Sequence, residues 1–304
     1  MDKLKVYIFG ASIGGETYYN LERNNIEVIG FLDNDKKKQG KQIDGISISN
    51  PEILKDISKE EYDFVVVTSM YIDSIIEQLL ELGISKNQLK FPPKSQLKIN
   101  KKPFETAELR EKATNLLCKI NEVLKDEKCF ISFGTLLGIV REKQLLSWDD
   151  DIDLSIFPKD IDSILVKLMS NIKFLSEDFQ LKIFKRQYID NSYANISIHC
   201  YHNEEDLFHV SLACLNEMEK GMYTQEVNIT PKHFFEGYDE LEFRNQIFKA
   251  PKQHKKYLEY TYGDWKVPKK NTSFYDNSLS YKESKKVNKS VNYYDYISEK
   301  EFIK

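Results

Sequence analysis

The sequence has little of what marks a secreted, zinc-stabilised or membrane-spanning protein. Its four cysteines are scattered without a CxxC pair, which argues against a disulfide framework or a structural zinc site. No apolar run approaches the ~20 residues of a spanning helix, and the N-terminus leads into an apolar stretch without a signal-peptide cleavage pattern. We therefore expect a cytoplasmic protein, which would meet a membrane-linked substrate at the inner face of the membrane.

An excess of charge of one sign is also missing. The 44 basic and 48 acidic residues give a formal net charge of -4, so the chain has no general attraction to nucleic acid or to anionic lipid. We expect no nucleic-acid partner. A length of 304 residues suffices for two domains with separate cores. The linker is predicted at 91–102 (FPPKSQLKINKK), which is rich in proline and lysine, so we expect domains at 1–97 and 98–304.

The first domain has the pattern of an α/β fold with a parallel sheet. Short apolar strands are predicted at 5–9, 27–32 and 62–68, and helices at 16–24 and 72–82. A glycine-rich turn, GASIGG, follows the first strand. In a Rossmann-type domain such a turn approaches a pyrophosphate, and an acid after the second strand binds ribose.

The candidate ligand-binding residues of this domain are therefore Gly10, Ser12, Gly15 and Asp33. Ser12 departs from the GxGxxG pattern, because it stands where the second glycine lets the backbone approach a pyrophosphate. The alternative is a docking or oligomerisation module whose glycine turn serves packing alone. A homo-oligomer is accordingly among our expectations.

The second domain is predicted to be α+β. An amphipathic helix is expected at 105–125, and another starts at Pro158. Strand-like runs follow at 179–184, 193–199 and 207–215. Residues 271–304 are polar and lack periodicity, so they either wrap the domain or are partly disordered.

Residues 130–157 read as a strand, a tight turn, a short helix, a loop and a second strand. Gly134 lets the backbone come close to a phosphate, and Thr135 stands where a helix N-cap belongs. The exposed N–H groups and the dipole of such a helix start favour an anion. Arg141, roughly two turns further on, is a candidate phosphate clamp.

The acids of the second strand carry the stronger signal. Asp151 and Asp153 alternate with apolar residues, so both carboxylates face the same side of the strand. Residues two apart lie roughly 6.6 Å apart along a strand, so these carboxylates can converge on one hard cation, Mg²⁺ or Mn²⁺. Asp149 and Asp150 come directly before them. The alternative is an ordinary solvated acid cluster.

These segments resemble the LicD family of phosphotransferases. The matching parts are 134–138 (GTLLG), 140–141 (VR) and 148–153 (WDDDID), followed downstream by Pro251, 257–258 (YL), 262–265 (YGDW) and Pro268. The resemblance implies a nucleotidyltransferase-like fold. It also implies transfer of a phosphorylated small group, such as phosphocholine or a phospho-alditol, from a CDP-linked donor to a glycan or lipid-linked sugar of the cell surface.

The predicted roles follow from the charge that develops during attack on a diphosphate. Asp151 and Asp153 hold the metal, and Asp149 or Asp150 accepts the proton of the acceptor hydroxyl. The substrate-binding residues are Gly134, Thr135, Arg141 and Trp148.

The sequence departs from the family on a later strand, where members usually carry a third aspartate. Ser211 stands at that position by our placement. Asp206 or His209 could substitute, or two carboxylates with donor phosphates and water suffice. A zinc site fits no familiar ligand spacing here; its candidates would be His199, Cys200, His202 and His209.

Two other functions stay open. A nucleotidyltransferase acting on a phosphorylated acceptor would use the same turn and the same acids. A catalytically silent scaffold protein would be consistent with Ser211 and with the altered glycine turn. Release of CMP would indicate phosphotransfer, and release of pyrophosphate would indicate nucleotidyl transfer.

Overall fold

The structure is a computed structural model of the chain. It describes residues 3–69, 72–93, 96–97, 102–188, 191–218, 221–225 and 228–268, and the backbone of 296–301. The chain divides into two compact units, with the division between Asn100 and Lys101. The expectation for residues 271–304 lies outside the described residues, apart from one strand at 296–301.

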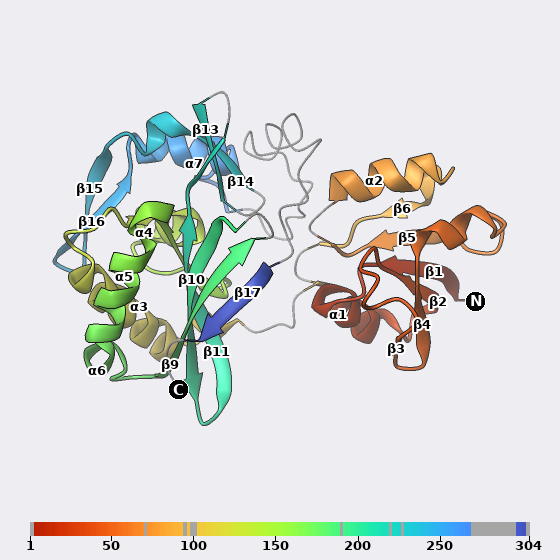
Figure 1. Cartoon of the computed structure of the whole chain (residues 1–304), viewed down its shortest axis with the longest axis horizontal. Coiled ribbons are helices and arrows are strands. Elements are labelled where there is room, and N and C mark those ends of the chain that lie inside the picture. Colours follow the sequence, from red (N-terminus) through yellow and green to blue (C-terminus); the bar gives the residue numbers. More distant parts are fainter. Residues whose placement is uncertain are drawn as a thin grey trace. The chain divides into compact units, whose positions relative to one another are not determined.

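The first unit is a Rossmann-like α/β domain, as predicted (Figure 1). Its sheet has the order β3-β4-β2-β1-β5-β6, and every pair in it is parallel except β3 with β4. The strands are β1 (Leu4–Phe9), β2 (Ile26–Leu32), β3 (Gln42–Ile43), β4 (Ile46–Ser49), β5 (Phe64–Val67) and β6 (Leu89–Lys90). The helices are α1 (Ile13–Glu22) and α2 (Ile72–Glu81), with 3-10 turns at Pro51–Lys55 and Lys86–Gln88.

Alternation along β1 builds a core on each face of this sheet. Tyr7 and Phe9 pack in a cluster that includes residues of α2, whereas Val6 and Ile8 pack in a second cluster on the α1 side. A sheet covered by helices on both faces explains why its strands read as nearly continuous apolar runs. The predicted start of α1 was three residues late, because the helix already begins at Ile13 within the glycine-rich segment.

The second unit is a mixed α/β domain built on a sheet of the order β17-β9-β10-β11-β8-β7 (Figure 1). Its strands are β7 (Phe130–Ile131), β8 (Asp151–Ile156), β9 (Gln180–Tyr188), β10 (Tyr193–His202), β11 (Glu205–Cys214) and β17 (Tyr296–Glu301). Only the neighbours β8 and β11 run parallel in this sheet; the other pairs are antiparallel. The predicted strands at 179–184, 193–199 and 207–215 are thereby confirmed.

Helices and two small sheets complete this unit. The helices are α3 (Ala107–Val123), α4 (Phe133–Glu142), α5 (Ile161–Ser170), α6 (Ile172–Leu175) and α7 (His254–Tyr262), with 3-10 turns at Pro103–Glu105, Pro158–Asp160 and Lys232–Phe234. The small sheets are β12 (Asn216–Met218), β13 (Met222–Gln225) and β14 (Asn228–Pro231), and β15 (Tyr238–Phe243) with β16 (Gln246–Pro251).

Register places two kinds of side chain on the two faces of the main sheet. One transverse row is apolar and fully buried in the core: Ile183, Ile198, Val210 and Ile152. The adjacent rows lie on the other face and are polar except for Phe184: Lys182, His199, His209 and Asp151, then Phe184, Ser197, Ser211 and Asp153. The acids of β8 therefore belong to a polar surface that crosses four strands.

Candidate active site

Asp151 and Asp153 lie on the outer face of β8, as the alternation predicted. Both are half-buried, while the residues between and after them, Ile152 and Leu154, are buried in the core. Strand pairing fixes this orientation, since β8 pairs with β11 on one side and β7 on the other. The two carboxylates are therefore held by the sheet and not by a mobile loop.

The Gly134–Thr135 segment contacts Asp153 directly. The Gly134 backbone N–H donates to Asp153 Oδ2 at 3.1 Å, and the Asp153 backbone N–H donates to Thr135 Oγ1 at 2.8 Å. The predicted N-cap role of Thr135 is wrong: α4 begins at Phe133 after Ser132, and Thr135 is buried in the first turn, where its hydroxyl is used by β8. The expected proximity of this turn to the acids is nevertheless present.

Gly134 is required because the carboxylate of Asp149 lies against it. A Cβ at this position would lie 2.1 Å from Asp149 Oδ2 and 3.4 Å from Asp153 Oδ2. Any side chain would displace these carboxylates. The absence of a side chain at Gly134 thus leaves space for the Asp149 carboxylate and lets the Gly134 backbone N–H reach Asp153.

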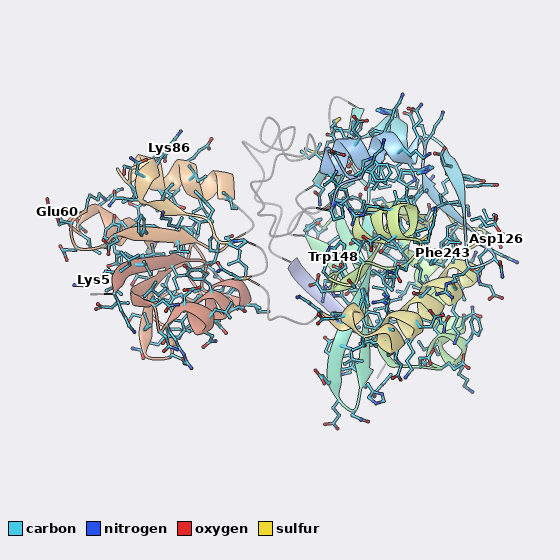
Figure 2. All side chains as sticks on the ribbon, turned by 180° about the vertical axis from the view of Figure 1, so that it is seen from behind. Lys5, Glu60, Lys86, Asp126, Trp148 and Phe243 are labelled. Carbon is cyan, nitrogen blue, oxygen red and sulfur yellow. The ribbon has the colours of Figure 1, made fainter. Side chains whose placement is uncertain are left out.

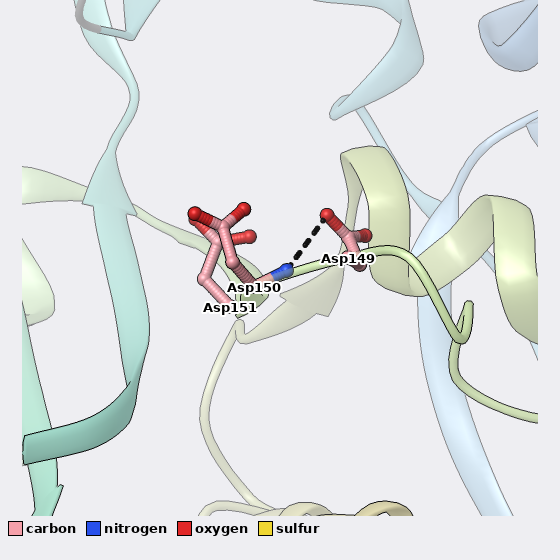
Figure 3. A group of neighbouring side chains, drawn as sticks. All are labelled: Asp149, Asp150 and Asp151. Carbon is pink, nitrogen blue, oxygen red and sulfur yellow. Dashed lines mark hydrogen bonds between the residues drawn. The ribbon is translucent and has the colours of Figure 1, made fainter. Parts of the chain in front are cut away.

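The acids before β8 complete a compact group (Figure 3). Oxygens of Asp149, Asp150 and Asp151 lie within 4.8 Å of one another, and all three residues are half-buried. Asp149 Oδ1 accepts the backbone N–H of Asp150 at 3.3 Å, and Figure 3 shows the Asp150 and Asp151 carboxylates side by side. The group that converges in the described chain therefore differs from the predicted metal pair, because Asp149 and Asp150 take part and Asp153 bonds to Gly134.

This group suits a hard divalent cation. Carboxylate oxygens are the ligands that Mg²⁺ and Mn²⁺ prefer, and one ion is commonly shared between protein carboxylates and substrate phosphates. Three oxygens within 4.8 Å are close enough for such sharing after small side-chain rotations. The assignment of Asp151 and Asp153 as metal ligands stays a prediction.

Helix α7 brings two tyrosines to the acids. Burial, followed by the nearby carboxylates of Asp153 and Asp149, raises the pKa of Tyr262 well above its ordinary value. Burial, with a smaller contribution from Asp153, also raises the pKa of Tyr257, which packs against Phe133. A raised pKa keeps both hydroxyls protonated well above neutral pH, and the electrostatic influence of Asp153 and Asp149 indicates that Tyr262 lies near these carboxylates. The downstream YGDW segment closes α7, with Gly263 at its C-cap (φ +69°).

Arg141 and Trp148 join the helix α4 to this C-terminal segment. The Arg141 guanidinium donates to the carbonyl of Trp265 at 3.0 Å and to Glu142 Oε1 at 2.9 Å, and it lies 5.6 Å from the centre of the Trp148 ring. Trp148 directly precedes Asp149 in the sequence and is 46% exposed (Figure 2). Arg141, the predicted phosphate clamp, is therefore already hydrogen-bonded within its own unit. Its contact with a substrate phosphate stays a prediction.

A buried polar network beneath the acids was not foreseen from the sequence. Ser155 Oγ donates to Ser132 Oγ at 2.9 Å, and Gln225 Nε2 donates to Ser155 Oγ at 2.8 Å and to the Ala213 carbonyl at 3.0 Å. Ser155 follows Asp151 and Asp153 on the same strand face, and Ser132 is the residue directly before α4. Gln225 lies 70 residues from its partner, so only long-range pairing could have identified it.

Strands β10 and β11 carry the four zinc candidates and the candidates for a third metal ligand, of which Asp206 lies 2.8 Å from His199 Nδ1. Ser211 does pair with Asp153, as we placed it. Cys200 is fully buried on the core face, and burial raises the pKa of its thiol well above the ordinary value, which disfavours a thiolate ligand. His202 is exposed at the end of its strand. The four zinc candidates therefore do not converge.

Among the candidate ligand-binding residues of the first unit, Asp33 is bonded to its own unit. Asp33 Oδ2 accepts the Ala11 backbone N–H at 2.9 Å and Lys38 Nζ at 3.0 Å. Ser12 is exposed before α1, without a side-chain cap bond. A Cβ at Gly15 would lie 1.9 Å from the Gly10 carbonyl oxygen. Ligand binding at Gly10, Ser12, Gly15 and Asp33 stays a prediction.

The fold and the acid-bearing strand define a two-domain protein, with a Rossmann-like unit followed by a nucleotidyltransferase-like unit. Within the described residues, no helix is both long and apolar enough to cross a membrane. Residues 126–253 match the family model described as LicD/FKTN/FKRP, nucleotidyltransferase domain, and residues 2–89 match that described as C2185-like, N-terminal. The second unit thus carries a LicD-family domain.

Several solved structures are similar to part of this chain. UDP-D-quinovosamine 4-dehydrogenase from Vibrio fischeri is 33% identical over 27% of this chain and 75% of its own, with a TM-score of 0.24. The lincosamide adenylyltransferase LnuA, in its lincomycin-bound form, is 13% identical over 59% of this chain and 98% of its own, with a TM-score of 0.32. The Rex-family repressor RSP is 19% identical over 27% of this chain and 43% of its own, with a TM-score of 0.24. Curated proteins give no match.

Proposed function

We propose that the protein is a metal-dependent phosphotransferase of the LicD type. It moves a phosphorylated small group, phosphocholine-like or a phospho-alditol, from a CDP-activated donor to a sugar of a cell-surface glycan or its lipid-linked precursor. The observation that carries this proposal is the group of carboxylates on and before β8, packed against the backbone N–H of Gly134. The proposal places the enzyme on the cytoplasmic side of the membrane.

The proposed reaction is a displacement at the phosphorus of the transferred group. The acceptor hydroxyl oxygen forms the new P–O bond, the diphosphate P–O bond breaks, and CMP leaves with its electron pair. Asp149 or Asp150 takes the proton of the attacking hydroxyl. Mg²⁺ or Mn²⁺, held by Asp151 and Asp153, would neutralise charge on the diphosphate and on the leaving phosphate.

The chain's own groups hold the reactants in place. The Tyr262 hydroxyl, protonated near neutral pH, can donate to an oxygen that gains charge. Arg141 lies 5.6 Å from the exposed ring of Trp148, which directly precedes Asp149, and the pair would offer charge and a flat surface to the nucleotide. The network of Ser132, Ser155 and Gln225 fixes the relative position of α4 and β8.

Product identity tests the proposal. The full chain is incubated with Mg²⁺ or Mn²⁺ and a panel of CDP-linked alditols and amines, first ranked by thermal shift, since a bound donor raises apparent stability. Metal-dependent release of CMP, even slowly to water, is expected. Release of pyrophosphate from CTP and a phosphorylated acceptor would instead show nucleotidyl transfer. Absence of any metal-dependent nucleotide binding in calorimetry would leave a scaffold role.

Asp153→Asn gives the residue-level test. The change keeps size but removes charge, so CMP release should fall by about 100-fold or more, while the melting temperature stays close to that of the wild type. Asp126→Asn is the matched control, because Asp126 is exposed at the outer edge of the same unit, away from Trp148 (Figure 2). A wild-type rate for Asp153→Asn at saturating Mg²⁺ would contradict the assignment.

A further inference from the structure

The imidazole of His209 lies beside the Asp151 carboxylate. It stands two residues before Ser211, the position at which the family pattern has a third acid. His209 pairs with Asp151 across β11 and β8, and its Nε2 lies 3.8 Å from Asp151 Oδ2. This separation is too long for a hydrogen bond. Two ligands of one ion held at ~2.1 Å lie roughly 3 to 4 Å apart, so the spacing suits a shared cation.

The ring of His209 is held in position by its neighbour on β10. His199 stacks on it with ring centres 5.5 Å apart and an interplanar angle of 21°. His199 is itself fixed, because Nδ1 lies 2.8 Å from Asp206 Oδ2 and Nε2 lies 3.3 Å from Arg186 Nη2. A guanidinium can only donate, so Nε2 accepts and Nδ1 carries the proton toward Asp206. These contacts fix the orientation of the His199 ring.

In the neighbouring row, β11 supplies no comparable ligand. Ser211, which pairs with Asp153, offers a hydroxyl in the place of a carboxylate. A neutral hydroxyl is a poorer partner for a divalent cation than a charged oxygen. The ligand set at this surface is therefore short of one carboxylate and has gained one imidazole, displaced by two residues along β11.

We propose that His209 Nε2 is a ligand of the divalent ion, together with Asp151, and that this shifts the preferred ion from Mg²⁺ to Mn²⁺. The proposal rests on the metal site of the proposed function. Mg²⁺ is bound almost wholly through oxygen, whereas Mn²⁺ also accepts imidazole nitrogen in mixed sites. His199, with Asp206 and Arg186, acts as a positioning residue, because it orients the ring that meets the ion.

Electron spin-echo spectroscopy of Mn²⁺ bound to the full-length protein tests this ligand directly. A coordinated imidazole modulates the Mn²⁺ echo through its ¹⁴N nucleus, so the wild type should show ¹⁴N modulation. The signal should vanish in His209→Gln and persist in His202→Gln, whose histidine is exposed at the far end of β10. Bound Mn²⁺ without ¹⁴N modulation in the wild type would overturn the proposal, and this outcome needs no variant to fold.

Calorimetry with each ion separates selectivity from simple stability. The wild type should bind Mn²⁺ at least about tenfold more tightly than Mg²⁺, and His209→Gln should lose about tenfold or more in Mn²⁺ affinity. His209→Asp should recover Mg²⁺ binding. Equal affinities of the wild type for the two ions, or an unchanged Mn²⁺ affinity in His209→Gln, would overturn the inference.

The two proposals fail in different ways. Binding of Mg²⁺ with CMP release, but no nitrogen ligand, would remove His209 from the site and leave the phosphotransferase assignment standing. Absence of binding of either ion, alone or with CDP, would overturn the metal site itself and the proposed function with it.

Discussion

Each unit of this chain contains a strand that leads through a glycine-containing segment into a helix, β1 into α1 and β7 into α4, yet the two segments serve different ends. In the first unit, a Cβ at Gly15 would meet the Gly10 carbonyl oxygen at 1.9 Å, and a Cβ at Gly14 would meet that of Thr68 at 2.9 Å. In the second unit, a Cβ at Gly134 would meet the carboxylate of Asp149 at 2.1 Å. Gly15 of the first unit is packed against backbone atoms, whereas Gly134 of the second is packed against an acidic side chain.

The acids that follow the two turns differ in the same way. Asp33 accepts from Ala11, Asp35 and Lys38, so both of its oxygens are engaged with the same unit. Asp151 and Asp153 lie on a polar sheet face with further acids directly beside them. A glycine turn followed by an acid is therefore a shared local pattern, and the partners of the carboxylate decide whether it supports structure or chemistry.

Alanine at each glycine gives the largest expected contrast. Gly15→Ala sets a methyl group against backbone, which cannot rotate away, so the first unit should lose at least ~1–3 kcal/mol of stability. Gly134→Ala instead displaces a carboxylate at the end of its side chain. We expect CMP release to fall about 100-fold, because small shifts of reacting groups are costly, with little change in melting temperature.

Two controls define this contrast. Ser12→Ala, in the same turn as Gly15, removes an exposed hydroxyl without a cap bond and should change stability by less than ~0.5 kcal/mol. In an Asp149→Ala background, Gly134→Ala should cost much less activity, because the clashing oxygens are gone. Additive losses in the double variant would show that the two residues act independently.

Asp33→Asn sharpens the comparison of the acids. An amide has one acceptor oxygen and places an NH₂ group toward N–H donors, so the stability of the first unit should fall by ~1–3 kcal/mol. Hydrogen exchange of peptides from β1 and β2 would measure this loss in the full chain. Asp44→Asn should have almost no effect, because the Asp44 side chain is 58% exposed and its ion pair with Arg23 is long, at 3.9 Å.

The same variant separates packing from ligand binding. If the turn only packs the unit, NAD should not raise the melting temperature of either protein. A thermal shift with NAD in the wild type that is lost in Asp33→Asn would make Asp33 a ligand-binding residue, as in a dinucleotide-binding domain.

Local patterns predicted most elements but not their partners. The alternation of Asp151 to Leu154 was sufficient to place both acids on one face of β8, and the apolar runs located β9, β10 and β11. The start of α4 could not be read, because the hydroxyl of Thr135 bonds to a strand 18 residues away and not to its own helix. The local sequence around Thr135 does not specify that partner.

Register explains the remaining failures. His209 stands opposite Asp151 because β11 pairs with β8, a strand far away in the sequence, and Gln225 reaches Ser155 through a side-chain hydrogen bond that spans 70 residues. A shift of one residue would reverse every side chain of a strand. Sequence periodicity gives the faces of each strand but not which residues stand opposite one another, so it could propose His209 without placing it beside Asp151.

The ionisation of buried tyrosines gives the smallest expected effect on folding stability. Each unit contains such a tyrosine, Tyr62 in the first and Tyr262 in the second. Burial, followed by the charge of Tyr7, raises the pKa of Tyr62 to about 12 in the first unit, as burial and carboxylates raise that of Tyr262 in the second. The unfolded chain loses the Tyr62 proton near pH 10, whereas the folded chain keeps it, so folding stability should fall as pH rises above 10.

Tyr62→Phe should remove this loss, which amounts to about 1 kcal/mol at pH 11. Near pH 7 the variant should be equally stable or slightly more stable, because the Tyr62 hydroxyl is buried and has no hydrogen-bond partner in the part of the chain that the structure describes. Denaturant unfolding between pH 8 and 11 measures the difference, with Tyr238→Phe, 47% exposed, as the control. Parallel pH profiles for the wild type and Tyr62→Phe would show that the hydroxyl ionises alike in the folded and unfolded chains.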